Sequence, residues 1–318
     1  MRCDLKFFFK WVAFFAFVVI VIPLILQRFV FVKRANSPIP EQGQLIKVFL
    51  SSENKVATMK SEEYVLGALM AEMPAEFESE ALKAQAVAIR TYLSNKLNAK
   101  NKNNGHEDAP ICDDSTHCQA YCSYEEMKNK WGKNASFYYE KCKIAVESTV
   151  GETAKYNGEP INAVFHAYSN GKTENAEDVW GSKVDYLVSV ESPGDLELPK
   201  LFSYFEIDVD EFKKKMSDVY GCNFDKNLIG DIVFTKGGSV SSIEIGNKVI
   251  KGTDLRKTFD LKSACFSIKQ IDDKIKFDVK GYGHGVGMSQ YGANYFAKQG
   301  LNYKEILEKY YTGISVSK

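Results

Sequence analysis

SEEYVLGALMAEMPAEFESEALKAQAVAIRTYLSNKL, residues 61–97, predicts two consecutive helices with a proline stop between them. The first helix is expected to have Ser61 as its N-cap and to end at Met73, because the residue before a proline is driven out of helical geometry. The second is expected over about residues 78–97, where apolar side chains recur at intervals of three and four. This buried stripe consists of Leu82, Ala86, Ile89, Leu93 and Leu97.

Segments with strand character follow these helices. Asn-Gly at 157–158 predicts a hairpin turn between strands at 154–156 and 161–167. The other expected strands are at 45–50 and in two pairs, 232–235 with 240–245 and 266–271 with 275–279. The other expected helices are at 136–147, after Ser289 with its end at Gly300, and at 303–311. Residues 98–115 are expected to form a loop. Early helices followed by strands predict an α+β fold, with helices packed around antiparallel strands, rather than a doubly wound sheet.

The N-terminal residues predict a membrane anchor. Residues 11–27 carry no charge and are slightly short of the ~20 residues of a span, but the basic stems of Lys10 and Arg28 can snorkel. A cleaved signal peptide is the alternative, although apolar residues 29–32 follow instead of a small-x-small cleavage pattern. Basic residues on both sides leave orientation undecided by the positive-inside rule. We expect a cytoplasmic stub and single transmembrane helix at 1–34, a linker at 35–44, and an extracytoplasmic domain at 45–318.

Composition narrows the class of protein. The 318 residues suffice for one large or two ordinary domains. The 41 basic residues balance 41 acidic ones and form no basic tract, so the charge distribution gives no support to nucleic-acid binding. Of the seven cysteines, Cys3 precedes the expected anchor, and three lie close together beside histidines. Those three are Cys112, Cys118 and Cys122, whereas Cys142, Cys222 and Cys265 are scattered. The clustering favours a metal site, and a disulfide framework remains the open alternative.

The stretch GHEDAPICDDSTHC, residues 105–118, offers two imidazoles and two thiols in one polar loop. Such a loop cannot be ordered by burial of its own side chains, so a tetrahedral metal bound by His106, Cys112, His117 and Cys118 would supply the missing order. Four protein ligands would fill the coordination of a zinc ion, which is the arrangement of a structural site. A Cys112–Cys118 disulfide or free thiols are the alternatives, and Cys122 is a spare candidate ligand.

Two further stretches combine polar residues with glycine. FHAYSNGKTENAEDVWG, residues 165–181, follows a predicted strand and could line a cleft for a hydroxyl-rich ligand or form an ordinary solvated turn. GYGHGVGMSQYGA, residues 281–293, has glycines at alternate positions, which let the backbone approach a ligand or another segment closely. Its spacing fails the G-x-G-x-x-G pattern, which excludes a dinucleotide loop. The alternative is a structural crossing in which His284 is a hydrogen-bonded core residue.

Glu72 is a carboxylate in an unexpected position. It shares a helix face with Val65 and Leu69 and lies at the predicted C-terminal end of that helix. Loss of hydration and the negative end of the helix dipole both raise the pKa of a glutamate above its ordinary value of about 4.3, as a general acid requires near neutral pH. The alternative is an ion pair with Arg90 or Lys83.

Three stretches together resemble the stage II sporulation protein D family of endospore-forming bacteria: EMPAEFESEALKAQAVAIRTY at 72–92, and the stretches at 165–181 and 281–293. The resemblance runs from about Leu45 to the C-terminus, and the cysteine- and histidine-rich loop is similar to that of the clostridial, zinc-containing branch. It implies that Glu72 is the essential glutamate and that one structural Zn²⁺ ion is held by His106, Cys112, His117 and Cys118. It also implies a glycan cleft with Tyr168, Ser169, His284, Ser289, Gln290 and Tyr291.

The resemblance implies a membrane-anchored lytic transglycosylase that cleaves the MurNAc–GlcNAc bond of peptidoglycan during forespore engulfment. Glu72 would protonate the oxygen leaving C1 of N-acetylmuramic acid, and the C6 hydroxyl of that sugar would close an anhydro ring, so the second carboxylate of water-using glycosidases is not needed. The implied partners are glycan strands and the stage II sporulation proteins P (an amidase) and M, at the mother-cell engulfing membrane. The alternatives are a non-catalytic glycan-binding activator of a cell-wall amidase and a zinc hydrolase with a metal-bound water.

Overall fold

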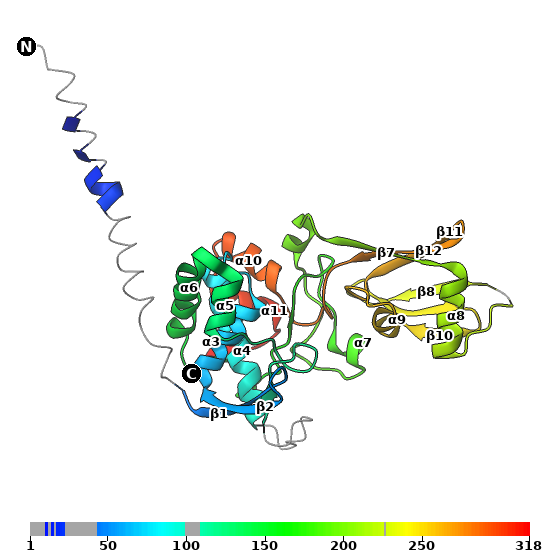
Figure 1. Cartoon of the computed structure of the whole chain (residues 1–318), viewed down its shortest axis with the longest axis horizontal. Coiled ribbons are helices and arrows are strands. Elements are labelled where there is room, and N and C mark those ends of the chain that lie inside the picture. The colour runs from blue at the N-terminus through cyan, green and yellow to red at the C-terminus, as the bar shows by residue number, and fades with distance from the viewer. Residues whose placement is uncertain (1–9, 12–13, 16, 23–42, 99–108, 226) are drawn as a thin grey trace, which may run out of the picture.

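The computed structural model describes residues 10–11, 14–15, 17–22, 43–98, 109–225 and 227–318 (Figure 1). Most of the expected anchor and linker, and part of the expected loop at 98–115, therefore lie outside the described residues. A short π-helix, Phe17–Val21, is described near the N-terminus. Among the described residues, no helix is both long enough and apolar enough to span a membrane.

A helical body occupies the left half of Figure 1 and is built around α4 (Ser79–Asn98). The predicted stripe of α4 is buried from Leu82 to Leu93, and Leu97 is partly buried. The helices that pack against α4 are α3 (Ser61–Glu72), α6 (Ala135–Ser148), α10 (Gln290–Lys298) and α11 (Tyr303–Tyr310), and α5 (Tyr124–Trp131) packs on α6. The C-terminal helices α10 and α11 therefore share one core with the two predicted helices.

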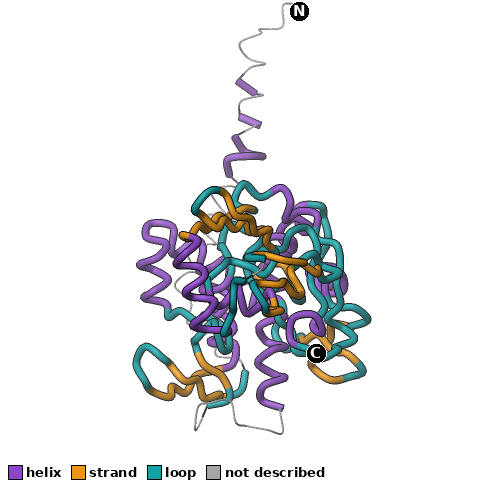
Figure 2. The backbone as a smooth tube through the Cα atoms, turned by 90° about the vertical axis from the view of Figure 1, so that its right-hand side faces the viewer, coloured by secondary structure: helices purple, strands orange, loops and turns teal. Residues whose placement is uncertain are grey.

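Short sheets border the helical body. β1 (Leu45–Leu50) pairs antiparallel with β2 (Lys55–Lys60) and parallel with β3 (Ile111–Cys112), and β4 (Thr153–Tyr156) lies between β5 (Glu159–Pro160) and β14 (Ser315–Ser317). The parallel pair of β6 (Phe165–His166) and β13 (Met288–Ser289) matters most for the site, because it brings residues 165–181 beside residues 281–293. Both stretches run mainly as loops, drawn in teal in Figure 2.

A second body, at the right of Figure 1, is inserted between β6 and β13. It has two antiparallel three-stranded sheets, with strand orders β10-β9-β8 and β11-β12-β7, and its own buried core around Phe212 and Phe277. Its elements are β7 (Phe202–Asp208), α8 (Val209–Tyr220), β8 (Ile229–Phe234), β9 (Val240–Ile245), β10 (Lys248–Lys251), α9 (Gly252–Thr258), β11 (Phe266–Ile271) and β12 (Lys274–Lys280). The expected domain at 45–318 thus contains two hydrophobic cores.

The predicted α+β class is confirmed, as are most of the predicted elements. The two strand pairs of the second body correspond to β8–β9 and β11–β12, and the predicted helices correspond to α3, α4, α6, α10 and α11. The predicted hairpin turn is also present, with Asn157 at φ 52° and Gly158 at φ 85°. Positive φ at both positions is what a two-residue hairpin turn requires, which explains the Asn-Gly sequence.

Three details of the prediction are wrong. Ser61 is the first residue of α3 and not its N-cap, because its N–H donates to the Gln44 carbonyl (2.9 Å) at the end of the β1–β2 ladder. Only β6 is strand within the stretch expected at 161–167, since the Asn162 N–H bonds instead to the Tyr186 hydroxyl (3.0 Å). The expected loop at 98–115 contains β3, whose pairing with β1 depends on a distant segment.

Candidate active site

Glu72 is the last residue of α3 and lines a groove of about 660 Å³. The helix ends there because Met73, which precedes Pro74, has extended geometry (φ −108°, ψ 139°). The helical body, the loops of both glycine-containing stretches and the second body all contribute to the groove. Its polar side chains include Glu72, Ser115, Thr116, His117, Gln119, His166, Arg256, His284 and Gln290.

The surroundings of Glu72 act on its carboxyl group in opposite directions. Burial raises the pKa of Glu72, whereas hydrogen bonding from the Ala120 backbone N–H and the Gln290 amide, and the positive charge of Lys130, lower it. The Ala120 N–H lies 2.7 Å from Oε1 of Glu72, and the Gln290 amide also donates to the Glu72 backbone carbonyl at 3.2 Å. Burial is the largest of these effects, so the predicted direction of the shift is confirmed.

The alternative ion pair for Glu72 is wrong, because both basic candidates have other partners. Arg90 makes two charge-assisted bonds to Glu62, from Nε to Oε1 at 2.8 Å and from Nη2 to Oε2 at 2.7 Å. This pair is buried and joins α4 to α3. Lys83 pairs with Glu80 at 2.7 Å, one turn earlier in α4.

Three of the four predicted metal ligands lie together. One ligand atom from each of Cys112, His117 and Cys118 falls within 4.8 Å of the others, and the His117 Nδ1 atom lies 3.3 Å from the Cys112 Sγ and 3.5 Å from the Cys118 Sγ. The fourth, His106, lies outside the described residues. Burial raises the pKa of the Cys112 thiol to about 12, so its thiolate form needs a cation beside it. Two soft sulfurs and an imidazole fit zinc.

The predicted disulfide alternative is not what the structure contains. The cysteines described as free thiols are Cys112, Cys118, Cys122, Cys142, Cys222 and Cys265. Cys122 bonds to α3 instead, since its N–H donates to the Gly67 carbonyl at 3.2 Å and its Sγ lies 3.7 Å from the same oxygen.

The cysteine-containing loop packs directly on the helix that carries Glu72. Gly67 of α3 is needed for this, because a Cβ there would lie 2.2 Å from the Tyr121 ring. The Tyr121 ring also stacks on Tyr64 of α3, with centroids 5.9 Å apart and planes at 5°. The Gln119 Oε1 accepts a bond from the Tyr64 hydroxyl at 3.3 Å. Residues 119–122 therefore fix the Ala120 N–H against Glu72.

Two neutral histidines lie in the groove. The Nδ1 of His284 accepts the Val286 N–H at 3.0 Å, and the Nδ1 of His166 lies 3.2 Å from the Val286 carbonyl, to which it donates. Burial lowers the pKa of His166 to about 4 and that of His284 to about 3. Both imidazoles are therefore uncharged near neutral pH, and neither supplies a positive charge to Glu72.

The six predicted cleft residues separate into three groups. His284 and Gln290 line the groove with Glu72. Ser169 and Ser289 are buried, and their hydroxyls donate to the carboxylate of buried Asp195 at 2.6 and 2.7 Å. Asp195 lies in the 3-10 helix Pro193–Glu197, so the two serines connect both glycine-containing stretches to that helix.

The third group is the tyrosine pair Tyr168 and Tyr291, whose rings meet edge to face at 5.7 Å. The Tyr168 hydroxyl donates to the Lys200 carbonyl at 3.0 Å, and the Lys200 ammonium lies 4.1 Å from the Tyr291 ring centroid. Tyr291 also packs against Phe77, five residues after Glu72, at a centroid distance of 4.8 Å. These tyrosines therefore support the wall near the end of α3.

Among the groove-lining residues that sequence reasoning missed are Trp180, Arg256 and Tyr282. Trp180, in α7 (Ala176–Trp180), is 47% exposed with its ring 5.1 Å from His284, and Tyr282 is 45% exposed. Both lie within the quoted stretches, and an exposed aromatic there is a signal for ligand binding. Arg256 comes from α9 of the second body, and nothing in its local sequence indicates a site.

Comparison with known proteins agrees with the resemblance of the motifs. The Stage II sporulation protein family matches residues 50–156. The stage II sporulation protein D of Bacillus amyloliquefaciens is 38% identical over 287 residues, covering 90% of this chain and 82% of that protein. Its namesake in Bacillus subtilis (strain 168) is 40% identical over 277 residues, covering 86% and 78%. The amidase enhancer of Bacillus subtilis (strain 168) is 29% identical over 304 residues, covering 79% of this chain and 40% of that protein. The chain belongs to the stage II sporulation protein D family.

Proposed function

We propose that the chain is a lytic transglycosylase that cleaves the MurNAc–GlcNAc bond of peptide-free peptidoglycan strands. The observation that carries the proposal is the carboxyl group of Glu72, which among the described residues is the only carboxylic acid lining the groove. A glycosidase that uses water generally needs two carboxylates, whereas a transglycosylase that uses a hydroxyl of its own substrate needs one. A groove with a single carboxylic acid of raised pKa therefore supports the second reaction.

In the proposed reaction Glu72 acts first as an acid and then as a base. It donates its proton to the glycosidic oxygen, the bond from that oxygen to C1 of N-acetylmuramic acid breaks, and the acetamido group stabilises the developing cation. The C6 hydroxyl then attacks C1, and the Glu72 carboxylate accepts the hydroxyl proton to leave an anhydro ring. Burial favours the protonated form needed first, while the Ala120 N–H and Lys130 favour the ionised form needed second.

The rest of the groove would bind and orient the glycan. The exposed rings of Trp180 and Tyr282 offer flat apolar surfaces to the apolar faces of sugar rings. Because His284 accepts a backbone N–H at Nδ1, its neutral ring carries the proton on Nε2. Gln290 would keep the end of α3 in place through its bond to the Glu72 carbonyl.

We assign one structural Zn²⁺ ion to Cys112, His117 and Cys118, with His106 as the proposed fourth ligand. Such an ion would order the loop that carries Ala120 and would take no part in proton transfer. The support for this role is the bond of the Ala120 N–H to Glu72, made two residues after Cys118.

A place in the cell envelope of sporulating cells follows from the family, and the finer assignments are part of the proposal. We place residues 1–34 as a single-pass anchor in the mother-cell engulfing membrane, with the domain outside the cytoplasm. Glycan strands would be the substrate, and the stage II sporulation proteins P and M the partners. An amidase among them would supply strands freed of their peptides.

A second candidate is a glycan-binding activator of a cell-wall amidase that does not cut the strand. The similarity to the amidase enhancer of Bacillus subtilis favours it. The two candidates differ in one product, the anhydromuramic end.

The deciding experiment incubates the full-length chain in detergent with purified peptide-free strands and measures anhydromuramic ends by mass spectrometry. We expect product from the wild type and a loss of about 10²- to 10⁴-fold in Glu72→Gln, the range for removal of a general acid. Glu76→Gln, an exposed glutamate four residues later, is the matched control and should retain activity. Equal product from wild type and Glu72→Gln, or none from the wild type, would contradict the proposal, and the latter result would favour the activator.

A further inference from the structure

The sheet β11-β12-β7 of the second body has one buried and one exposed face. The register pairs Phe202 with Lys280 and Tyr204 with Asp278, and strand alternation sets these four side chains on the same face. Ser267 of β11 pairs with Asp278 of β12 and therefore lies on this face as well. The other face carries the core residues Phe205, Phe277 and Val279.

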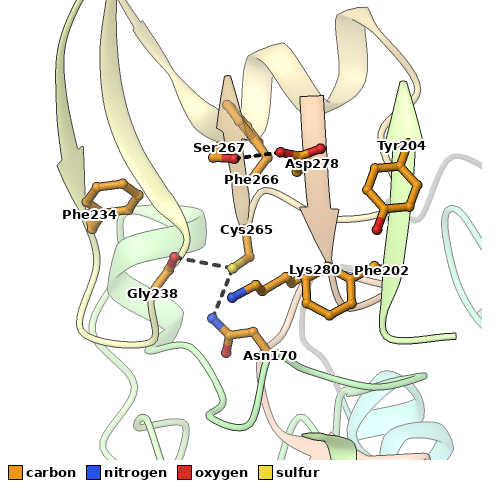
Figure 3. A pocket seen from close by; sticks show the side chains of 10 residues that line it. All are labelled: Asn170, Phe202, Tyr204, Phe234, Gly238, Cys265, Phe266, Ser267, Asp278 and Lys280. Carbon is orange, nitrogen blue, oxygen red and sulfur yellow. Dashed lines mark hydrogen bonds between the residues drawn. The ribbon is translucent and has the colours of Figure 1, made fainter. Parts of the chain in front are cut away.

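A pocket of about 480 Å³ lies on the exposed face, and none of its lining residues also lines the groove of Glu72. Figure 3 shows Phe234 on one side of it and Phe202 with Tyr204 on the other. The exposed fractions of the three aromatic residues are 56% for Phe234, 47% for Phe202 and 72% for Tyr204. Aromatic surface left open in this way, on two sides of one pocket, is typical of a ligand site.

Polar groups lie between the aromatic residues. Lys280 extends over the Phe202 ring, 5.4 Å from its centroid, and Asp278 accepts a bond from Ser267 at 3.4 Å. Asn170 is held in place because its amide donates to the Gly237 carbonyl at 3.0 Å and to the Cys265 sulfur at 2.9 Å. The pocket therefore offers one cation, Lys280, and one carboxylate, Asp278, beside apolar rings. Asp278 is paired with the Lys269 ammonium at 3.3 Å.

The pocket is connected with the groove through shared residues. A smaller depression is lined by Asn170 and Lys280, which also line the pocket, and by Gly283 and His284, which also line the groove. Lys280 of the pocket and Tyr282 of the groove are two residues apart on the chain. One extended polymer could therefore contact both places.

We propose that this pocket is a second glycan-binding site, which holds a peptide-free strand away from Glu72; the inference rests on the proposed function. The apolar faces of sugar rings would stack on Phe202, Tyr204 and Phe234. N-acetylmuramic acid without its peptide has a free lactyl carboxylate, which Lys280 would bind. A polymer that alternates this anionic sugar with a neutral one matches a pocket in which Lys280 lies among aromatic rings and the Asp278 charge is offset by Lys269.

The test measures binding of labelled peptide-free strands to the full-length chain in the Glu72→Gln background, so that no strand is cut. Adding Tyr204→Ala and Phe234→Ala together should raise the Kd about tenfold or more, as for truncation of aromatic anchors. Adding Phe137→Ala, an exposed phenylalanine on α6, is the matched control and should leave the Kd unchanged. An unchanged Kd in the double-alanine variant with an unchanged unfolding midpoint overturns the inference, as does absence of strand binding by Glu72→Gln itself.

A second arm tests the charge. Lys280→Gln should weaken binding of muramic strands but not of uncharged chitin oligosaccharides, and equal effects on both probes would overturn the carboxylate assignment. Failure of the proposed reaction is distinguishable from failure of this inference. If binding depends on Tyr204 and Phe234 but the wild type forms no anhydromuramic product, the proposed reaction is wrong and the second glycan-binding site stands. If the wild type forms product but binding does not depend on Tyr204 and Phe234, the reaction stands and the second site is wrong.

Discussion

The backbone N–H of Ala120 donates a 2.7 Å hydrogen bond to Oε1 of Glu72, and Ala120 lies two residues after the candidate metal ligand Cys118. The loop that could hold a metal ion is therefore also the loop that contacts the candidate acid. Because the donor is a backbone N–H, its position is set by the conformation of the loop and not by the identity of a side chain. Order in this loop and chemistry at Glu72 are thus physically coupled.

We predict that Cys112→Ser reduces bound zinc from about one ion per chain to none and lowers activity about 10- to 100-fold. The reason is that the Ala120 N–H stabilises the ionised Glu72 that accepts the hydroxyl proton in the second proposed step. A hydrogen bond to a charged group contributes about 1.5–3 kcal/mol, which corresponds to that range of rates. Metal content by atomic emission and release of anhydromuramic ends are the two measurements. Cys222→Ser, a free and buried cysteine of the second body, serves as the control and should keep its metal. Full metal content in Cys112→Ser would refute the ligand set.

The raised pKa of Glu72 predicts how activity varies with pH. The first step of the proposed reaction needs the protonated carboxyl group, so kcat/KM should fall as the pH rises through the pKa of Glu72, which lies above the ordinary value. Lys130→Ala removes a positive charge that favours the ionised form, and this raises the pKa of Glu72 further. The alkaline limb of the pH profile should therefore move to higher pH in that variant. Lys133→Ala, at an exposed lysine, is the control, and a limb that moves to lower pH in Lys130→Ala would contradict this account.

The fold of the helical body was predictable where the sequence carries a local signal. The apolar stripe of α4, the proline after α3 and the Asn-Gly turn each specify a local geometry, and all three are present. α5 was missed because Met127 is its one buried side chain, and a stripe this sparse differs little from a solvated segment. α8 does carry a helical stripe, formed by Val209, Phe212, Met216 and Tyr220, so its local signal was present and was overlooked.

The site was predictable only in part, for a similar reason. Cys112, His117 and Cys118 are close in sequence, so their grouping has a local signal, whereas the Ala120 contact is a backbone bond that any residue except proline could make. Arg256 reaches the groove only because the second body folds against it. The preference of Arg90 for Glu62 over Glu72 depends on how two helices pack, and spacing within one helix does not determine it.

Trp180 supplies a prediction about substrate binding. Its ring is about half exposed beside His284, and it lies on the short helix α7 and not in the core. Trp180→Ala should raise KM for glycan strands about tenfold with a smaller change in kcat, since loss of a stacking surface removes binding common to ground and transition states. Trp180→Phe should recover part of the loss. An unchanged KM in Trp180→Ala would remove this residue from the substrate site.

The buried pair of Arg90 and Glu62 predicts a large effect on stability. Both side chains are nearly inaccessible, at 6% and 4% exposure, so removing one partner leaves the other charge buried without compensation. Arg90→Leu should lower the free energy of unfolding by about 3–5 kcal/mol, measured by urea denaturation. The double variant Arg90→Leu with Glu62→Met removes both charges and should recover most of that loss. Lys83→Leu, which breaks the more exposed pair with Glu80, is the control and should cost about 1 kcal/mol or less. A double variant as unstable as Arg90→Leu would show that packing, and not the orphaned Glu62 charge, accounts for the loss.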